Sequence, residues 1–587
     1  MLPVLEVAPP DLISVQKQDA AEEGFEKPYR IGIEVPVTLD MEKVGQWVVL
    51  PEGGKIWRLK INCAGAQALG LNYRELHLPT GSDLFVYTPD QQHVIGAYSS
   101  AEIPLNHTFA TRPLPGSQLV IEYYEPVPTN SKAVLSISGL VYIYRGFDEL
   151  GSTKSTSSSS CEVNVNCAEG NNWQNQKQGV VKIMTKVGGS YLYCSGTLLN
   201  NTAQDFSSLF LTAAHCSKDN NSSASADDYN YWVFYFNYEY PGCTPSSSPN
   251  HSITGALKLA IADNPSDIGS DFLLLRLLGD IPGSYYPYYC GWDKVDEVPS
   301  SGVCMHHPGG DVKKISTYSS QASSTTWGGT PGTHWSVSWV ATANGHGVTE
   351  GGSSGSALFN QDGLVIGTLT GGPSSCQNPT DADLFGKVAY SWESNGTDSA
   401  HQLKPWLDPL NIGTSKMAGT FNETKAIADF TANVQIIPIG GMINFQDLSA
   451  GKPITWHWYF TGGTPAESTD QNPSSIQFGS AGKHDVKLVV TNVHNTDSLI
   501  KKAFVDVRSA ISPNPSSGHI NILTDVNNSS NVTVDIYNML GQQVQEISFL
   551  NPVPASIGVD LPTEGNMFIV KIKQGDWQQT NKVLVLH

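Results

Sequence analysis

Three short segments of the chain contain residue types that could hydrolyse an amide bond if the fold brings them together. His215 follows an apolar, strand-like run, and Asp271 begins a strongly apolar run at 272–275. Ser354 lies in a glycine-rich turn at 351–356 that runs directly into a second core-like strand. Taken singly, these are a structural histidine, a turn or cap aspartate and a flexible Gly/Ser loop. Together they predict a nucleophilic serine site.

The chemistry of such a site requires these residue types. A serine hydroxyl is a poor nucleophile near neutral pH, so His215 would take the proton of Ser354 during attack on a carbonyl. Asp271 would hold the other ring N–H and stabilise the imidazolium. Glycines before the serine allow the N–H groups of Gly352 and Ser354 to point at the developing oxyanion. The chain order His, Asp, Ser is that of the chymotrypsin class.

The elements that must position these residues are β-strands. At 587 residues the chain is long enough for three to five domains, and its short apolar/polar runs between turn clusters predict an all-β protein. Only 15% of the residues are charged, and the formal net charge is −20, which disfavours nucleic acid and anionic membranes as partners. No apolar stretch reaches the roughly 18 residues of a membrane-spanning helix. The first residues do not resemble a secretory signal, so either a signal was trimmed or export is not visible there.

Cysteine usage points to export. Eight of the nine cysteines lie between Cys161 and Cys376, as in a disulfide framework, and Cys63 stands apart. The alternative is a zinc site, but paired CxxC or Cys/His ligand spacings are missing. We expect no metal and no cofactor.

The chain divides by composition into four parts. Residues 1–154 are a β-rich segment that ends in a Ser/Thr-rich tether, and residues 155–412 contain the three chemical segments. Residues 421–508 and 509–587 are each long enough for a small β-sandwich, and neither has clustered catalytic residue types. We predict a prosegment, an enzyme and two accessory domains.

The central region resembles bacterial lysyl endopeptidase, a secreted, lysine-specific branch of the chymotrypsin-like serine proteases. The resemblance covers roughly residues 155 to 410 and rests on the segments 161–170, 305–308, 347–350 and 371–376 beside the three catalytic segments. It implies a chymotrypsin-like double β-barrel that hydrolyses peptide bonds after lysine. It also implies the disulfides Cys161–Cys376, Cys167–Cys243 and Cys194–Cys216. Cys290 and Cys304 have no counterpart in that pattern, and we infer that they pair with each other.

The resemblance also predicts a specificity pocket. The position of the acidic residue in the trypsin pocket, six before the nucleophile, is Val348 here. The family takes its acid from after the 371–376 segment, and the matching residue is Asp383, with Glu350 as the alternative. A buried carboxylate can pair with a lysine ammonium whose methylene stem is desolvated. Trp327 matches a tryptophan of the substrate cleft, and Thr370, followed by Gly371, replaces a histidine that stacks on it in the family.

Activation should differ from that of trypsin. Ser353 takes the place of the aspartate that pairs with a new N-terminus in trypsin, so the latency of this zymogen would come from the prosegment. We predict self-catalysed cleavage between Lys154 and Ser155 in the tether, with Arg145 as the less accessible rival.

The last two parts resemble known modules. Residues 421–508 resemble a PKD-type β-sandwich, and residues 509–587 resemble the sorting domain of the type IX secretion system. They imply a bacterial protein exported across the outer membrane to the surface or the medium, with the secretion machinery and protein or peptide substrates as partners. A monomer is expected. The alternatives are a protease with arginine or mixed preference and an inactive surface binding protein.

Overall fold

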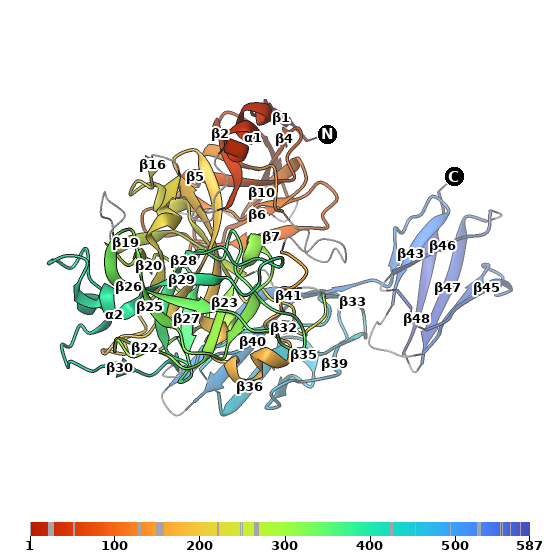
Figure 1. Ribbon diagram of the computed structural model, residues 1–587. Helices are drawn as coiled ribbons and strands as arrows, with labels where there is room; N and C mark the ends of the chain where they lie inside the picture. The colour runs from red at the N-terminus through yellow and green to blue at the C-terminus, as the bar shows by residue number, and fades with distance from the viewer. Residues whose placement is uncertain are drawn as a thin grey trace. The chain divides into compact units, whose positions relative to one another are not determined.

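Runs rich in β-branched and aromatic residues form β-strands in every part of the computed structural model, which confirms the predicted all-β class (Figure 1). Two compact units comprise residues 1–421 and residues 422–587. The structure describes residues 2–21, 29–50, 53–126, 131–147, 158–219, 222–246, 248, 251–262, 269–422, 426–451, 453–492, 495–524, 530–551, 553–554, 556–563, 565–575 and 577–586.

The N-terminal region of the first unit contains helix α1 (Leu12–Ala21) and strands that belong to two sheets. One sheet contains β1 (Val4–Val7), β3 (Gln46–Val49), β4 (Lys55–Cys63), β6 (Asp83–Tyr87), β7 (Val94–Tyr98) and β10 (Gln118–Glu125). The other contains β2 (Tyr29–Asp40), β5 (Ala68–His77), β8 (Phe109–Ala110), β9 (Leu114–Pro115) and β11 (Val134–Ile143). One hydrophobic core fills the space between them.

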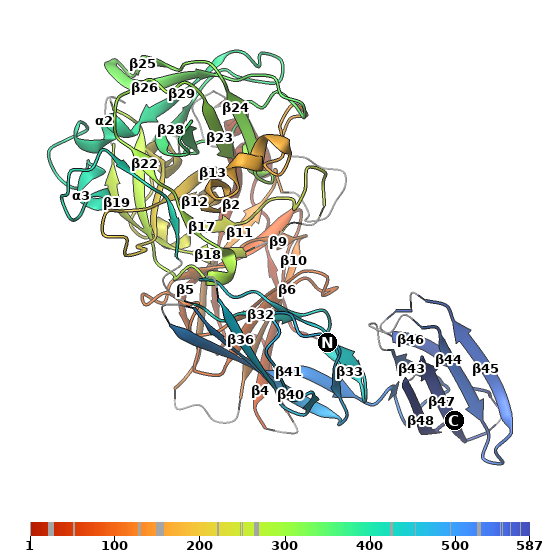
Figure 2. The ribbon, with the colours of Figure 1, turned by 90° about the horizontal axis from the view of Figure 1, so that it is seen from below.

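The second of these sheets continues into the central region. Its strand β2 pairs with β13 (Ser190–Leu199), so that β13, β2 and β11 run side by side (Figure 2). The same sheet holds β12 (Val180–Val187), β14 (Leu209–Ala213), β17 (Val233–Phe236), β18 (His251–Thr254), β19 (Ala256–Ile261) and β20 (Phe272–Leu277). These strands enclose a core of their own and form the first barrel of the central region.

A separate sheet forms the second barrel. It contains β22 (Trp292–Asp293), β23 (Gly302–His306), β24 (Lys314–Tyr318), β25 (Ser323–Trp327), β26 (Thr330–Ser338), β27 (Ala357–Asn360), β28 (Val365–Gly371), β29 (Ala382–Lys387) and β30 (Lys416–Met417). Helices α2 (Val388–Glu393) and α3 (Lys404–Leu407) follow the last long strand. The segment that carries Ser354 lies between β26 and β27 and meets the first barrel.

One edge of β13 is shared by three partners. Ser190–Tyr193 pair with β2, Thr197–Leu199 pair with β14, and between them the N–H of Ser195 donates to the carbonyl oxygen of Ser354 at 2.8 Å. The N-terminal region and the segment that carries Ser354 are therefore neighbours on the same strand.

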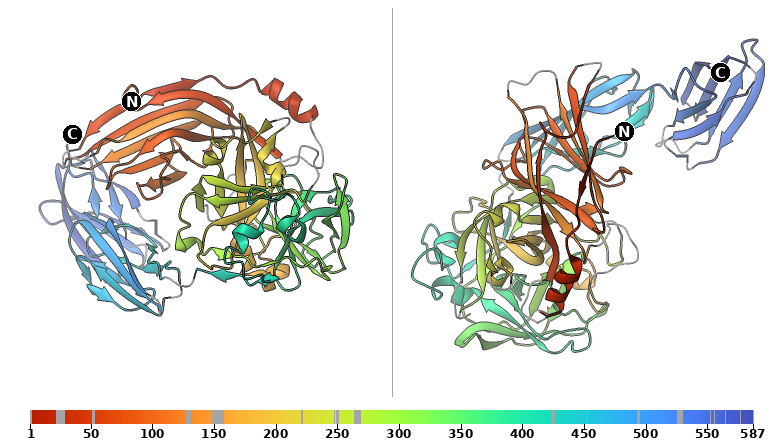
Figure 3. Two further views of the ribbon diagram at one scale, coloured as in Figure 1. Left: turned by 90° about the vertical axis from the view of Figure 1, so that its left-hand side faces the viewer. Right: turned by 90° about the horizontal axis from the view of Figure 1, so that it is seen from above.

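The second unit consists of small β-sandwiches (Figure 3). The first has β32 (Phe430–Ala432), β33 (Ile436–Pro438), β34 (Met442–Ile443), β35 (Phe445–Asp447), β36 (Thr455–Phe460), β37 (Gly463–Thr464), β38 (Glu467–Ser468), β39 (Ile476–Phe478), β40 (Gly482–Thr491) and β41 (Thr496–Arg508). The second has β42 (Ile511–Ser512), β43 (His519–Leu523), β44 (Val532–Tyr537), β45 (Gln543–Phe549), β46 (Ser556–Asp560), β47 (Met567–Gln574) and β48 (Trp577–Leu584). Each sandwich has its own core. No helix in the described part of the chain is long and apolar enough to cross a membrane.

Candidate active site

His215 and Asp271 meet because their strands pair. The last residue of β14, Ala213, lies opposite the first residue of β20, Phe272, so the residues just beyond that pair adjoin each other. His215 Nδ1 lies 2.7 Å from Asp271 Oδ2, and the His215 backbone N–H donates to Asp271 Oδ1 at 3.0 Å. Asp271 has a φ of +50°, an unfavourable value for a residue with a side chain, which is consistent with a constrained site.

The charge of Asp271 is stabilised in place. Burial raises the pKa of this carboxyl, but the charge and hydrogen bonds of His215 outweigh burial and hold its pKa below the ordinary value. The other ring nitrogen, His215 Nε2, is buried and has no hydrogen-bond partner among the described residues. The pair is thus oriented with one nitrogen available to accept a proton.

The backbone of Ser354 lies beside Cys216, the neighbour of His215. Its carbonyl oxygen is 3.6 Å from the sulfur of Cys216, the residue after His215, and its side chain is almost buried. No hydrogen bond joins the Ser354 hydroxyl to His215 in this conformation, although the His215–Asp271 pair and the Ser354 backbone both adjoin Cys216. Such bonds are often absent in unliganded enzymes.

The turn before Ser354 requires glycine at one position. Gly352 has a φ of +94°, and a Cβ there would lie 2.9 Å from the carbonyl oxygen of His307. Within the described part of the chain, neither the Gly352 N–H nor the Ser354 N–H donates to an acceptor. Both therefore remain available as donors to an oxyanion, the role that the sequence predicts for them.

Asp383 is fully buried on β29 and lacks a cationic partner among the described residues. Its Oδ2 accepts from Trp339 Nε1 at 2.7 Å, Thr349 Oγ1 at 2.7 Å and Ser374 Oγ at 2.6 Å, and its Oδ1 accepts from Ser374 N at 3.2 Å. Burial raises the pKa of this carboxyl, and the hydrogen bonds oppose that shift. An uncompensated carboxylate, held by neutral donors, is thus placed next to the segment that leads to Ser354.

The other residues predicted for the substrate cleft lie next to His334, which was not predicted. Thr370 Oγ1 lies 2.9 Å from His334 Nε2, and the ring of Trp327 lies 6.1 Å from that of His334. Gly371 is the last residue of β28 and pairs with Leu384. Burial lowers the pKa of His334 to about 4, so the imidazole is neutral near pH 7. His334 lies alone in a threonine-rich strand, and no motif of the sequence marked it.

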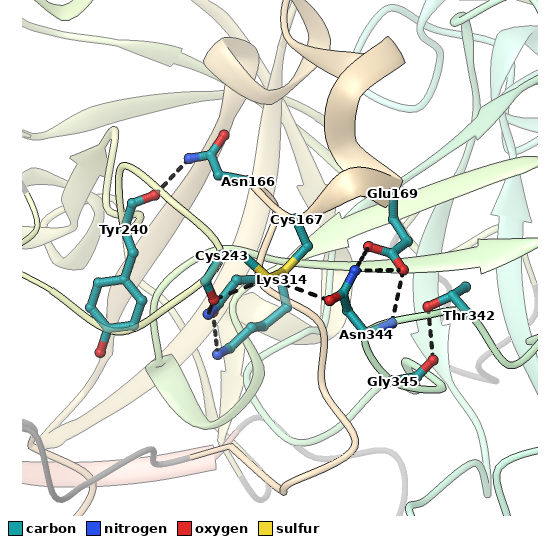
Figure 4. The surroundings of a disulfide bond; sticks show 10 residues. Asn166, Cys167, Glu169, Tyr240, Cys243, Lys314, Thr342, Asn344 and Gly345 are labelled. Carbon is teal, nitrogen blue, oxygen red and sulfur yellow. Dashed lines mark hydrogen bonds between the residues drawn. A yellow bond between two sulfur atoms is a disulfide. The ribbon is translucent and has the colours of Figure 1, made fainter.

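Three disulfides are present: Cys161–Cys376, Cys167–Cys243 and Cys194–Cys216. They are the pairs that the resemblance implies. Figure 4 shows how the second bridge is held: Asn166 donates to the Tyr240 carbonyl oxygen, and Asn344 contacts Glu169 and the sulfur of Cys243.

The predicted Cys290–Cys304 disulfide is wrong. Both residues are free and fully buried, as is Cys63. Cys290 packs in a core with Leu199 and Trp292, whereas Cys304 packs in another with Val348 and lies 3.1 Å from the Ser356 hydroxyl. Pairing by elimination failed because a buried free cysteine serves as a small apolar side chain.

Three parts of the chain match known protein families. Residues 155–386 match the family model "Lysyl endopeptidase, C-terminal domain", residues 427–504 match "PKD domain", and residues 510–586 match "Secretion system C-terminal sorting domain". The chain is an all-β serine endopeptidase with two accessory domains, and it is exported to the cell surface or beyond. The sorting domain implies the secretion machinery as a partner.

Among individual proteins, the chain is similar to a lysyl endopeptidase of Pseudomonas aeruginosa, with 29% identity over 351 residues, 57% of this chain and 72% of that protein. All three components of the resemblance to lysyl endopeptidase, PKD and sorting domains are confirmed. Among solved structures, a Glu endopeptidase matches at 18% identity and a TM-score of 0.25, over 40% of this chain and 95% of that one. An HtrA-type protease with a bound decapeptide matches at 10% identity and a TM-score of 0.24, over 57% and 95%. With TM-scores this low, the two structures say nothing about activity.

Proposed function

We propose that the enzyme cleaves peptide bonds after lysine, with His215, Asp271 and Ser354 as its catalytic triad. The observation that carries the lysine preference is Asp383, a buried carboxylate that accepts four hydrogen bonds from neutral donors and has no cation beside it among the described residues. A buried charge without a counter-ion is costly, and a substrate ammonium would supply that counter-ion.

The geometry supports a mechanism through an acyl-enzyme. His215 Nδ1 donates to Asp271, which leaves Nε2 to take the Ser354 proton as the hydroxyl oxygen attacks the scissile carbonyl carbon. The tetrahedral oxyanion would accept from the Gly352 and Ser354 N–H groups. The imidazolium then returns its proton to the leaving amine, and a water molecule, activated in the same way, releases the acid product.

Specificity would depend on the two segments that contact Asp383. Thr349 precedes the nucleophile turn, and Ser374 follows β28, so the carboxylate lies between them. Val348, fully buried beside them, adds no charge. We assign Trp327, Thr370 and Gly371 to the same cleft, where the neutral His334 holds Thr370. A lysine side chain would extend its methylene stem along apolar surface and place its ammonium at Asp383.

We further propose the domain limits 1–154 for a prosegment, 155–412 for the protease, 421–508 for the PKD-like domain and 509–587 for the sorting domain. The predicted cut between Lys154 and Ser155 lies outside the described residues. The rival Arg145 is engaged, because its Nε donates to the Arg30 carbonyl oxygen at 2.7 Å and its guanidinium lies 3.3 Å from Asp19.

Latency would come from the strand pairing at β13. Tyr193, paired with the start of β2, is two residues from Ser195, about 7 Å along a strand. Residues of both regions, including Ile31, Val141, Met184 and Tyr191, also share one hydrophobic cluster. The buried Lys186 lies 3.3 Å from Glu34 across the junction and 2.7 Å from Asp228 of its own barrel, so its charge has a partner on each side. We expect the mature enzyme to be a monomer that acts on protein and peptide substrates.

The test is cleavage of a peptide library in which only the residue before the scissile bond varies. The proposal predicts cleavage after lysine, with arginine a poor second. Equal cleavage after arginine would support mixed specificity. Absence of cleavage by the processed protein would support a surface binding protein instead.

A further inference from the structure

A buried hydrogen-bond chain runs behind the nucleophile turn. His306, at the end of β23, lies with its Nδ1 2.7 Å from Ser353 Oγ and its Nε2 3.0 Å from Ser316 Oγ on β24. All three side chains have no solvent exposure. Ser353 immediately precedes the proposed nucleophile.

The neighbours of this chain fix the direction of each hydrogen bond. Ser316 Oγ donates its proton to the Val348 carbonyl oxygen at 2.8 Å, so it accepts from His306 Nε2–H. His306 Nδ1 then has no proton and accepts from the Ser353 hydroxyl, whose oxygen accepts from the Glu350 N–H at 3.1 Å. One imidazole thus connects both ends of the segment 348–353.

The hydrogen-bond chain of Ser353, His306 and Ser316 contains no charged group. Burial, helped by nearby Lys314, lowers the pKa of His306 to about 3, so the ring is neutral near pH 7. Glu162 lies 3.7 Å from His306 Nε2 and is likewise buried. Burial, together with Glu350, raises the pKa of Glu162 well above its ordinary value, which favours the neutral acid.

We infer that Ser353, His306 and Ser316 are positioning residues that order the oxyanion-binding turn 350–354 through neutral hydrogen bonds. This inference rests on the proposed role of Ser354. An ion pair between a new N-terminus and an acidic residue before the nucleophile is impossible here, because Ser353 occupies that position. The neutral chain performs the same structural task, and it is complete in the uncleaved polypeptide. The turn is therefore already ordered before the prosegment is removed.

The test compares Ser353→Ala with the wild type after both full-length proteins have processed themselves and their active sites have been titrated. The substitution leaves His306 Nδ1 and the Glu350 N–H without their buried partner. We expect kcat/KM for a lysyl peptide to fall roughly 10- to 100-fold, mainly through kcat. A lysyl peptide aldehyde, whose tetrahedral adduct places an oxyanion in the site, should lose affinity by the same factor. The affinity of n-pentylamine, which can only fill the lysine pocket, should change less than twofold.

Two variants separate a local role from general damage. Ser316→Ala removes the far end of the hydrogen-bond chain and keeps Ser353, so it should show the same pattern with a smaller loss. If Ser353→Ala does not fold, the kinetics of Ser316→Ala test the inference by themselves. Thr185→Val removes another fully buried hydroxyl, one without a hydrogen-bond partner in the described structure, and should leave all three constants unchanged. Wild-type kcat in both serine variants, or equal weakening of aldehyde and amine, would overturn the inference. Activity in Ser354→Ala would instead overturn the proposed nucleophile.

Discussion

Replacement of Asp383 by Asn tests the specificity pocket with a near-isosteric change. In the wild type the carboxylate is fully buried, and four neutral donors hold it. A bound lysine ammonium would be its only positive partner among the described groups. Removing one member of a buried charge pair costs about 3–5 kcal/mol. At about 1.4 kcal/mol per tenfold, kcat/KM for a lysyl peptide should fall roughly 10²- to 5 × 10³-fold.

The substitution should reduce the stability of the protein less than it reduces kcat/KM for lysyl peptides. The hydroxyls of Thr349 and Ser374 can rotate to accept from the new amide, whereas Trp339 Nε1 and the Ser374 N–H can only donate. One amide orientation leaves Trp339 satisfied and creates a single donor–donor conflict at the long Ser374 N contact of 3.2 Å. One unsatisfied buried group costs about 1–3 kcal/mol of stability.

The assay measures kcat/KM for three peptides that differ only in lysine, arginine or norleucine before the scissile bond. Asp383→Asn should reduce the lysine-to-norleucine ratio by nearly the whole predicted factor, because norleucine never paired with the carboxylate. Glu350→Gln is the matched control and should leave the ratio unchanged. An unchanged ratio in Asp383→Asn, with collapse in Glu350→Gln, would refute the assignment and give the pocket to Glu350.

Four further outcomes follow from the structure. Ser354→Ala and His215→Ala should each lower activity on the order of a million-fold without lowering the melting temperature, because triad members act as a unit; a residual rate of one tenth in either would exclude that residue from the triad. After the cut at Lys154, the prosegment should remain bound through β2 and its shared hydrophobic cluster and co-elute in gel filtration until it is degraded, whereas immediate dissociation would argue against strand pairing as the cause of latency. Because the pKa of Glu162 is raised in the folded state, the stability contributed by its neutral form is present below the unfolded pKa of 4.5 and is lost as pH rises through the folded pKa. In urea unfolding of the Ser354→Ala protein, the form with Glu162 should therefore lose stability relative to Glu162→Gln as pH increases. Parallel pH profiles of the two proteins would contradict this. Alkylation without reductant should modify Cys63, Cys290 and Cys304 only after unfolding, and a cross-linked Cys290–Cys304 peptide would contradict the free thiols.

The residues that could be predicted from the sequence are those next to a recognisable strand pattern. His215 and Ser354 each follow or precede a recognisable apolar strand, and strand pairing between β14 and β20 explains why Asp271 joins them. The disulfides implied by the resemblance are present, because a family pattern records partners that spacing alone does not reveal.

The roles of His334, His306 and Lys186 could not be predicted, because they arise from contacts between strands that are distant in the sequence. His334 reaches Thr370 only because β26 and β28 flank β29. His306 was visible in a motif, but its hydrogen bonds to Ser353 and Ser316 depend on three separate segments. Lys186 alternates on β12 like a solvent-exposed residue, but it is buried and paired with Glu34 of the N-terminal region and Asp228 of its own barrel. Tertiary packing decided each case.

Covalent labelling with a peptide phosphonate that carries a lysine side chain identifies the nucleophile and the specificity in one experiment. The processed enzyme is treated with this phosphonate or with its norleucine analogue, and the adduct is located by mass spectrometry of the digested protein. We predict a single adduct on Ser354 that forms at least tenfold faster with the lysine reagent. An adduct on another residue, or equal rates for the two reagents, would contradict it.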